Sequence, residues 1–183
     1  FHLYTRELKR ISLSGEVIKG ELPDVITPRY LSAIGKTDSI IYIYGGLGND
    51  LGKQEYGVVH YKDLYKLNLN DYSLEKKWAM PENLCDEVAA STLIVDEVEK
   101  GEHAKGLFFS SGRFLSSLVL KDLNLENGQE TVLGDTIPYT FLDVNSHADL
   151  IYLASEKCYY AVTVHQVEGN NYEANIYSIA SPV

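Results

Sequence analysis

The segment with the clearest chemical potential is IIYIYGGLGND, residues 40–50, in which five strand-forming residues run into Gly45, Gly46 and Gly48. A glycine-rich turn after a strand can hold phosphate through its backbone N–H groups. A Walker loop, however, continues into Gly-Lys-Ser/Thr, and a dinucleotide fingerprint opens a helix. Residues 49–63 are polar and do neither. We therefore interpret the glycine pair as a place where a neighbouring strand or ring approaches the backbone closely.

The other residue types that could support catalysis or metal binding are dispersed. No histidines pair at metal-ligand spacing, no serine lies in a Gly-x-Ser-x-Gly context, and the carboxylates are set in turns. We therefore predict no catalytic residue, no bound metal and no cofactor. The five histidines are His2, His60, His103, His147 and His165.

The most promising binding surface is the segment 47–62, the longest insertion between predicted strands. Insertions of this kind gather at one end of a β-scaffold, where ligands bind. Tyrosine and polar amides suit the recognition of sugars or proteins. An exposed hairpin extension without a ligand is an alternative that the sequence leaves open. The candidate binding residues are Asn49, Asp50, Gln54, Tyr56, His60 and Tyr61.

Composition excludes several classes of partner. The 183 residues carry a formal net charge of −10, which argues against binding nucleic acid or an anionic membrane surface. No apolar run approaches the length of a membrane-spanning helix, so we expect no membrane insertion. Cys85 and Cys158 form no metal-binding spacing, and whether they pair in a disulfide stays open.

The sequence predicts an all-β fold. Helical periodicity is nearly absent, turn residues recur every 8–14 residues or so, and the 14 tyrosines favour strands. Residues 99–105 look like a solvated turn. The predicted strand segments are 2–15 and 16–22 as a hairpin, 29–39, 40–46, 62–71, 73–80, 91–112 as two strands, 116–128, 129–138, 139–155 as two strands, 158–170 and 172–182.

The order of strands and turns recurs. Pro28, Pro81, Pro138 and Pro182 each close a set of predicted strands, about four to an interval. Four antiparallel strands in a repeat of roughly 45–55 residues indicate a propeller blade. Strand density alone also permits a sandwich. The recurrence favours a β-propeller fragment of about 3.5 blades, with 1–28 ending one blade and further blades at 29–81, 82–138 and 139–183.

The succession of PRY, YIYGG, DLYKLNL and a more distant Trp78 resembles a kelch repeat. The resemblance implies structural roles for Gly45, Gly46, Tyr65 and Trp78. The later repeats have FFSSG and YLASE in place of the glycine pair. The C-terminal part resembles the last blades of bacterial kelch proteins similar to the galactose-oxidase central domain, which are mostly extracytoplasmic. The copper ligands of the oxidases cannot be placed on residues of this chain by motif.

The resemblance implies a function without catalysis. A kelch-like module of this kind would recognise a protein or a glycan, as part of a larger bacterial surface or periplasmic protein. The remaining blades would come from the parent chain or from another chain, because a half propeller leaves a sheet face uncovered. The alternative is a portion of a sugar-active enzyme, galactose-oxidase-like or glycoside-processing, whose catalytic residues lie outside this chain.

Overall fold

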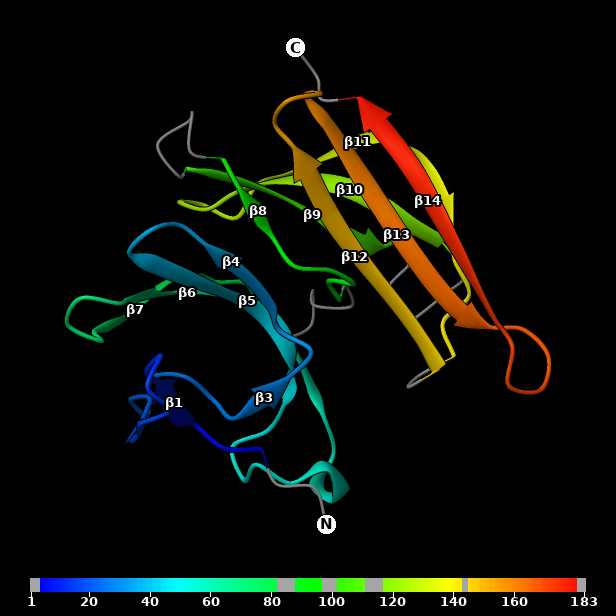
Figure 1. Ribbon diagram of the computed structural model, residues 1–183. Helices are drawn as coiled ribbons and strands as arrows, with labels where there is room; N and C mark the ends of the chain where they lie inside the picture. Colours follow the sequence, from blue (N-terminus) through cyan, green and yellow to red (C-terminus); the bar gives the residue numbers. More distant parts are fainter. Residues whose placement is uncertain (1–3, 82–87, 97–101, 111–116, 143–144, 181–183) are drawn as a thin grey trace.

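The computed structural model describes residues 4–81, 88–96, 102–110, 117–142 and 145–180. The predicted all-β class is confirmed, because the described part consists of strands β1 to β14 and one short 3-10 turn. The strands form separate antiparallel sheets that follow one another in chain order (Figure 1). We call β1–β2 the hairpin sheet, β3–β7 sheet 1, β8–β11 sheet 2 and β12–β14 sheet 3.

The strands of the first two sheets lie close to the predicted segments. They are β1 (Glu7–Ile11), β2 (Val17–Glu21), β3 (Arg29–Tyr30), β4 (Ala33–Lys36), β5 (Ile40–Gly48), β6 (Val59–Asn68) and β7 (Leu74–Ala79), with the 3-10 turn η1 at Gln54–Tyr56. In sheet 1, β3 and β4 both pair with β5. β5 also pairs with β6, and β6 pairs with β7.

Sheets 2 and 3 continue the same meander. Their strands are β8 (Ile94–Val95), β9 (His103–Phe109), β10 (Ser117–Asn124), β11 (Glu130–Pro138), β12 (Ser146–Leu153), β13 (Cys158–Gln166) and β14 (Tyr172–Ala180). The prediction of two strands within 139–155 is wrong for its described residues, which form β12 alone. Tyr139 and Phe141 instead pack their rings against Phe109 of sheet 2, at centroid distances of 6.0 and 5.6 Å.

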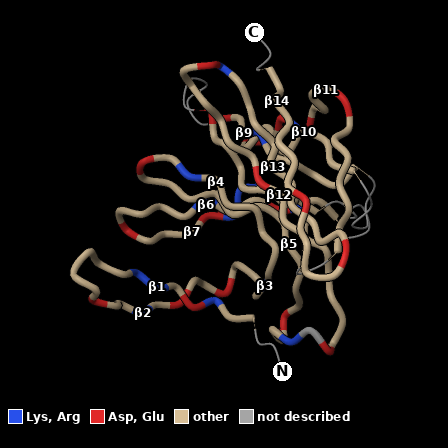
Figure 2. The backbone as a smooth tube through the Cα atoms, turned by 45° about the vertical axis from the view of Figure 1, so that its right-hand side comes forward, with Lys and Arg blue, Asp and Glu red and all other residues tan. Residues whose placement is uncertain are grey.

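The sheets stack face to face (Figures 1 and 2). The core lies between them. One cluster, which includes Tyr44, Leu64 and Phe108, fills the space between sheets 1 and 2. A second, which includes Leu120 and Leu150, fills the space between sheets 2 and 3. Sheet 2 therefore packs apolar side chains against the sheets on both of its sides.

The strands β4, β8 and β12, one from each main sheet, lie next to one another. Gly35 of β4 forms a parallel bridge with Leu93, and the Thr92 hydroxyl donates to Asp149 Oδ1 of β12 at 2.8 Å. Each sheet spreads outward from this junction as an antiparallel meander. No sheet closes on itself in the described part of the chain.

The glycine pair makes a close approach between strands possible. Gly45 and Gly46 have φ of 59° and 103°, and the register between β5 and β6 shifts at this point. A Cβ on Gly46 would lie 2.5 Å from Ser32 Oγ and 2.8 Å from the Tyr30 carbonyl oxygen. β5 does not end at the pair, as the sequence predicts, but runs through it to Gly48, because the irregularity keeps both ends of the strand paired.

Trp78 joins sheets 1 and 2. Its indole N–H donates to the Leu125 carbonyl at 3.0 Å, and its ring makes an edge contact with Tyr44 at 6.0 Å. Gly128, at φ 75°, brings its backbone against the same ring, where a Cβ would lie 3.0 Å from ring carbons. Trp78 is thus a structural residue whose packing partners come from β5 and from the β10–β11 turn.

A buried carboxylate also joins these two sheets. Glu130 of β11 pairs with Lys62 at 2.8 Å and Lys121 at 2.9 Å, and it accepts a hydrogen bond from the Tyr44 hydroxyl at 3.2 Å. Burial alone would raise the pKa of Glu130, but the hydrogen bonds and charges of the two lysines outweigh burial and hold this pKa below its ordinary value of 4.5.

Substitution of Gly46 tests the close approach. We expect Gly46→Ala to lower the free energy of unfolding by about 3 kcal/mol, because the methyl group adds a collision to the backbone strain. Gly134→Ala is the matched control: φ is 78°, but no atom lies within 4 Å of the added Cβ, so only about 1–2 kcal/mol of conformational strain remains. The free energy of unfolding is measured in urea, and equal losses in Gly46→Ala and Gly134→Ala would contradict the close approach at Gly46.

Glu130 predicts a pH dependence with a definite sign. Because its folded pKa lies below its ordinary value of 4.5, the stabilisation is fully present above the ordinary pKa and is lost as pH falls through the folded pKa. Glu130→Gln should destabilise the protein at pH 7 and flatten the decline of stability between about pH 5 and 3. Glu126→Gln, an exposed partner of Lys77, is the control. Parallel pH profiles of wild type and Glu130→Gln would refute the prediction.

Candidate functional site

A polar cavity of about 290 Å³ lies on the face of sheet 1 that is turned away from sheet 2. Its walls are the segment leading into β3, the start of the β5–β6 loop, β6 and the far end of β7. The lining residues are Val25, Thr27, Asn49, Asp50, Val59, His60, Tyr61, Lys62, Asp63, Tyr65, Lys76, Ala79 and Met80.

The structure brings four of the six predicted binding residues together in this lining, namely Asn49, Asp50, His60 and Tyr61. Gln54 and Tyr56 belong to η1, and Tyr56 is not among the lining residues. Tyr56 is 63% exposed, with the Lys53 ammonium 5.7 Å from its ring.

The insertion is shorter than the sequence predicts. His60 and Tyr61 lie in β6 and not in a loop, because Val59 to Tyr61 pair with Gly48 to Gly46 of β5. Only residues 49–58 connect the two strands. The backbone of Tyr61 is therefore held by its strand pairing with β5. A paired strand positions a binding residue more rigidly than a loop can.

Asn49 organises the connection. Its side-chain oxygen accepts from the backbone N–H groups of Leu51 and Lys53 at 3.1 and 3.2 Å. Its amide nitrogen donates to the carbonyls of Lys53 and Gly57, both at 2.6 Å. Since these contacts use the bonding groups of the side chain, Asn49 shapes the site and leaves its neighbour Asp50 at the cavity.

The base of the cavity is a buried ion pair that sequence reasoning missed. Arg29 Nη1 and Nη2 contact the Asp63 carboxylate oxygens at 2.6 and 3.1 Å, and the two side chains are 5% and 6% exposed. Nε donates to the Thr27 carbonyl at 3.0 Å, and Nη1 also donates to the Gly45 carbonyl at 2.9 Å. The guanidinium thus holds β3, the glycine irregularity and β6 together.

Two tyrosines flank this guanidinium. Its carbon lies 4.2 Å from the ring centre of Tyr61 and 5.2 Å from that of Tyr65. Burial raises the pKa of Tyr65 to about 12, and burial also raises the pKa of Tyr61 despite the opposing effects of Thr27 and Arg29. Both phenols are therefore neutral. The Tyr65 hydroxyl donates to the Val25 carbonyl at 3.0 Å, which ties the segment before β3 to sheet 1.

The charged side chains at the cavity rim, Asp50 and Lys76, are less fully paired than the buried Arg29 and Asp63. Among the described residues no ion pair involves Asp50, whose carboxylate accepts a long hydrogen bond from Thr27 at 3.5 Å. The Lys76 ammonium lies 5.7 Å from the Tyr65 ring. His60 has its Nδ1 buried with no hydrogen-bond partner in the described structure. The cavity therefore combines a carboxylate, an ammonium, phenols and an imidazole.

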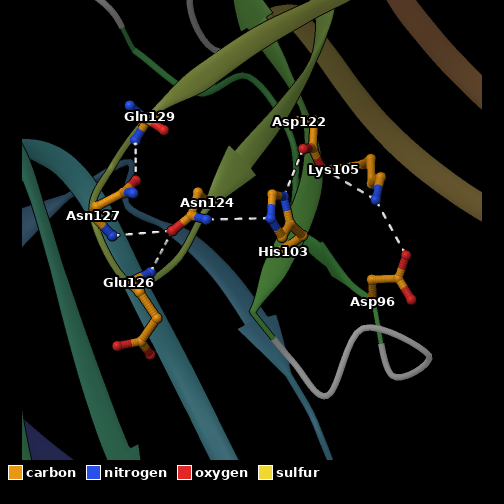
Figure 3. A network of polar contacts seen from close by, with 8 residues as sticks. All are labelled: Asp96, His103, Lys105, Asp122, Asn124, Glu126, Asn127 and Gln129. Carbon is orange, nitrogen blue, oxygen red and sulfur yellow. Dashed lines mark hydrogen bonds and ion pairs between the residues drawn. The ribbon is translucent and has the colours of Figure 1, made fainter.

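A second polar network lies on sheet 2 (Figure 3). His103 Nδ1 lies 2.7 Å from Asp122 Oδ2, and its Nε2 lies 3.2 Å from the Asn124 amide nitrogen. Lys105 bridges Asp96 and Asp122 at 3.2 Å each. The interpretation of 99–105 as a solvated turn is wrong for His103 and Lys105, which belong to β9.

This second network has a structural role. The Asn124 side-chain oxygen accepts from the N–H groups of Glu126 and Asn127 and so caps the turn that packs on Trp78. Both ring nitrogens of His103 are engaged by side chains of the neighbouring strand β10. The network therefore stabilises the β10–β11 turn.

The described residues contain neither a metal-binding cluster nor a membrane-spanning helix. No group of three or more His, Cys, Asp or Glu side chains there is arranged to hold a metal ion. In the same part of the chain, no helix is long and apolar enough to cross a membrane. Cys158 lies half-buried in β13, and Cys85 lies outside the described residues, so their pairing stays untested.

Comparison with known proteins identifies no family. No protein-family model matches the chain. No curated protein is significantly similar to it in sequence. The resemblance to kelch repeats therefore stays a prediction from the sequence.

Substitution of Arg29 tests the base of the cavity. Arg29→Met leaves Asp63 buried without its cation, and we expect a loss of about 3–5 kcal/mol in the free energy of unfolding. Arg29→Met combined with Asp63→Leu should lose less than Arg29→Met alone, because no unpaired charge remains. Arg10→Met, at an exposed arginine that contacts Tyr72, is the control and should have a much smaller effect. An Arg29→Met variant as stable as Arg10→Met would contradict this role.

Proposed function

We propose that the chain is a non-catalytic recognition module that binds a glycan in the polar cavity of sheet 1. The observation that carries the proposal is the convergence of Asp50, Tyr61 and Lys76 on one concave site of about 290 Å³. This is the lower end of the size range of small-molecule sites, suited to a single sugar residue. Sugar hydroxyls both donate and accept, so a carboxylate, a phenol and an ammonium can each serve them.

A glycan fits better than a protein surface because the site is small, concave and polar. Protein interfaces are broader and place aromatic or arginine anchors in dry pockets. Here Arg29 is not available to a ligand, because its N–H groups donate to Asp63 and to the carbonyls of Thr27 and Gly45. The ligand would therefore meet the rim groups and not the buried guanidinium.

The same ion pair argues against hydrolysis in this cavity. Glycosidases use two carboxyl groups, one as acid and one as base or nucleophile. The carboxylates that line the cavity are Asp50 and Asp63. Asp63 is bound in two places by Arg29, which leaves Asp50 without a second carboxylate to work with. Binding without turnover is the function that this arrangement supports.

We place this module in a kelch-like β-propeller of a bacterial surface or periplasmic protein. Three features support the propeller: the meander order of each main sheet, the face-to-face stacking of the sheets, and the adjacency of β4, β8 and β12. The residues to which the resemblance assigns structural roles also make packing contacts or hydrogen bonds within the fold. They are Gly45, Gly46, Tyr65 and Trp78. Extracytoplasmic glycans would then be the available ligands.

A glycan array followed by calorimetry with the best oligosaccharide tests the proposal. Tyr61→Phe and Asp50→Ala should each weaken binding about tenfold, because each removes a hydrogen-bonding group from the cavity. Tyr56→Phe is the matched control for Tyr61→Phe, since it makes the same change outside the cavity, and it should bind normally.

Three outcomes would revise the proposal. Equal affinities of the Tyr61→Phe and Tyr56→Phe variants would exclude the cavity as the site. Release of a cleaved sugar would favour an enzyme. Capture of a protein in place of any glycan, with loss of capture in Asp50→Ala, would keep the recognition role and reject the glycan.

A further inference from the structure

The two charged side chains of the cavity rim belong to opposite ends of the cavity. Tyr61 and Tyr65 lie four residues apart on β6, which is about 13 Å in an extended strand. Asp50 is near Tyr61, because burial raises the pKa of Tyr61 and the negative charge of Asp50 raises it further. Lys76 pairs with Tyr65 in the register of β6 and β7, and its ammonium lies 5.7 Å from the Tyr65 ring. We call the end at Asp50 the acidic end and the end at Lys76 the basic end.

The two ends do not neutralise each other. Exposed charges separated by more than a Debye length, about 8 Å at physiological ionic strength, are largely screened from one another. Within the described part of the chain, neither Asp50 nor Lys76 forms an ion pair with any other residue, and both side chains are exposed. Each charge is therefore available to a group that enters the cavity.

The other charged residues at the cavity are already neutralised. Asp63 forms its buried ion pair with Arg29. The Lys62 ammonium lies 2.8 Å from the Glu130 carboxylate, between sheets 1 and 2. A ligand in the cavity therefore meets one negative charge at the acidic end and one positive charge at the basic end.

This distribution of charge discriminates among sugars. A neutral sugar would displace water from both the carboxylate and the ammonium without offering either an opposite charge. A sugar with one charge would compensate one end and leave the other. A sugar with both charges compensates both ends, and its reversed orientation is rejected because like charges would then meet.

From these two separated and unpaired charges we infer that the ligand of the sheet 1 cavity is a zwitterionic sugar residue, whose ammonium contacts Asp50 and whose carboxylate contacts Lys76. The cavity of about 290 Å³ suits one sugar residue, so both groups belong on the same ring, as in an amino uronic acid. The hydroxyls of Thr27 and Tyr61 are further acceptors for the ammonium at the acidic end. The inference rests on the proposed function, since it names the class of glycan that the module binds.

Four methyl glycosides that differ in charge test the inference by NMR titration of the protein. They are the glycosides of glucose, glucosamine, glucuronic acid and glucosaminuronic acid, which carries both charges. We expect the last to bind most tightly, and the loss of either charge to weaken binding at least about tenfold. The corresponding galactose series is measured in parallel, so that the orientation of one ring hydroxyl does not decide the result.

Two substitutions separate the two contacts. Asp50→Asn should abolish the preference for the amino group and keep the preference for the carboxylate, and Lys76→Gln should do the reverse. Asp135→Asn on β11 and Lys36→Gln on β4 are the matched controls, because they make the same changes at exposed residues outside the cavity. Both controls should keep both preferences. Circular dichroism of each variant confirms that it is folded.

Equal affinities within both series, or no binding of any member, would overturn the inference. So would a preference for both charges that persists in Asp50→Asn and in Lys76→Gln. The proposed function fails separately. A neutral glycan from the array that binds in wild type and more weakly in Tyr61→Phe would keep the recognition module and reject the zwitterionic ligand. An array without any bound glycan would reject glycan recognition itself.

Discussion

The buried contact between Arg29 and Asp63 is the interaction on which sheet 1 and its cavity depend. A guanidinium that is 5% exposed needs hydrogen-bond partners, and the Asp63 carboxylate and the carbonyls of Thr27 and Gly45 supply them. The Gly45 carbonyl can turn toward Arg29 only because Gly45 and Gly46 adopt positive φ, and Tyr61 and Tyr65 then enclose the cation from two sides. The glycine irregularity, the flanking tyrosines and the cavity base are therefore one unit. The rim residues Asp50 and Lys76 are positioned by this unit without belonging to it.

Much of the fold could be predicted from the sequence, because strand formation depends on local patterns. The alternation in 62–71 predicted β6 but not its ends, whereas the prolines Pro81 and Pro138 predicted where β7 and β11 end nearly to the residue. Errors arose where tertiary packing overrode the pattern. Tyr139 and Phe141 have strand propensity, yet their rings complete the core between sheets 2 and 3. The all-β class followed from composition, whereas the stacking of separate sheets required the side chains of facing strands.

The site was predictable only in part. Asp50 and Tyr61 belonged to a segment that was conspicuous for its length and composition. Arg29 and Asp63 were missed because a lone arginine or aspartate in a strand usually faces solvent, and no local signal pairs residues 34 positions apart. The nearest hint was the arginine of PRY, placed just before the glycine-rich strand. His103 and Lys105 were missed for the same reason, since their partners Asp122 and Asn124 lie on the next strand.

The meander order of the sheets has a consequence for how the chain folds during synthesis. Each sheet uses strands that are consecutive in the chain, so it can form once its last strand has left the ribosome, without waiting for distant segments. Sheet 1 then offers Tyr44 and Leu64 as a template for sheet 2, and sheet 2 offers Leu107 and Leu120 to sheet 3. Each new sheet thus covers the apolar face left open by the one before it. The surface at risk of aggregation moves along the stack as the chain grows, and it never exceeds one sheet face.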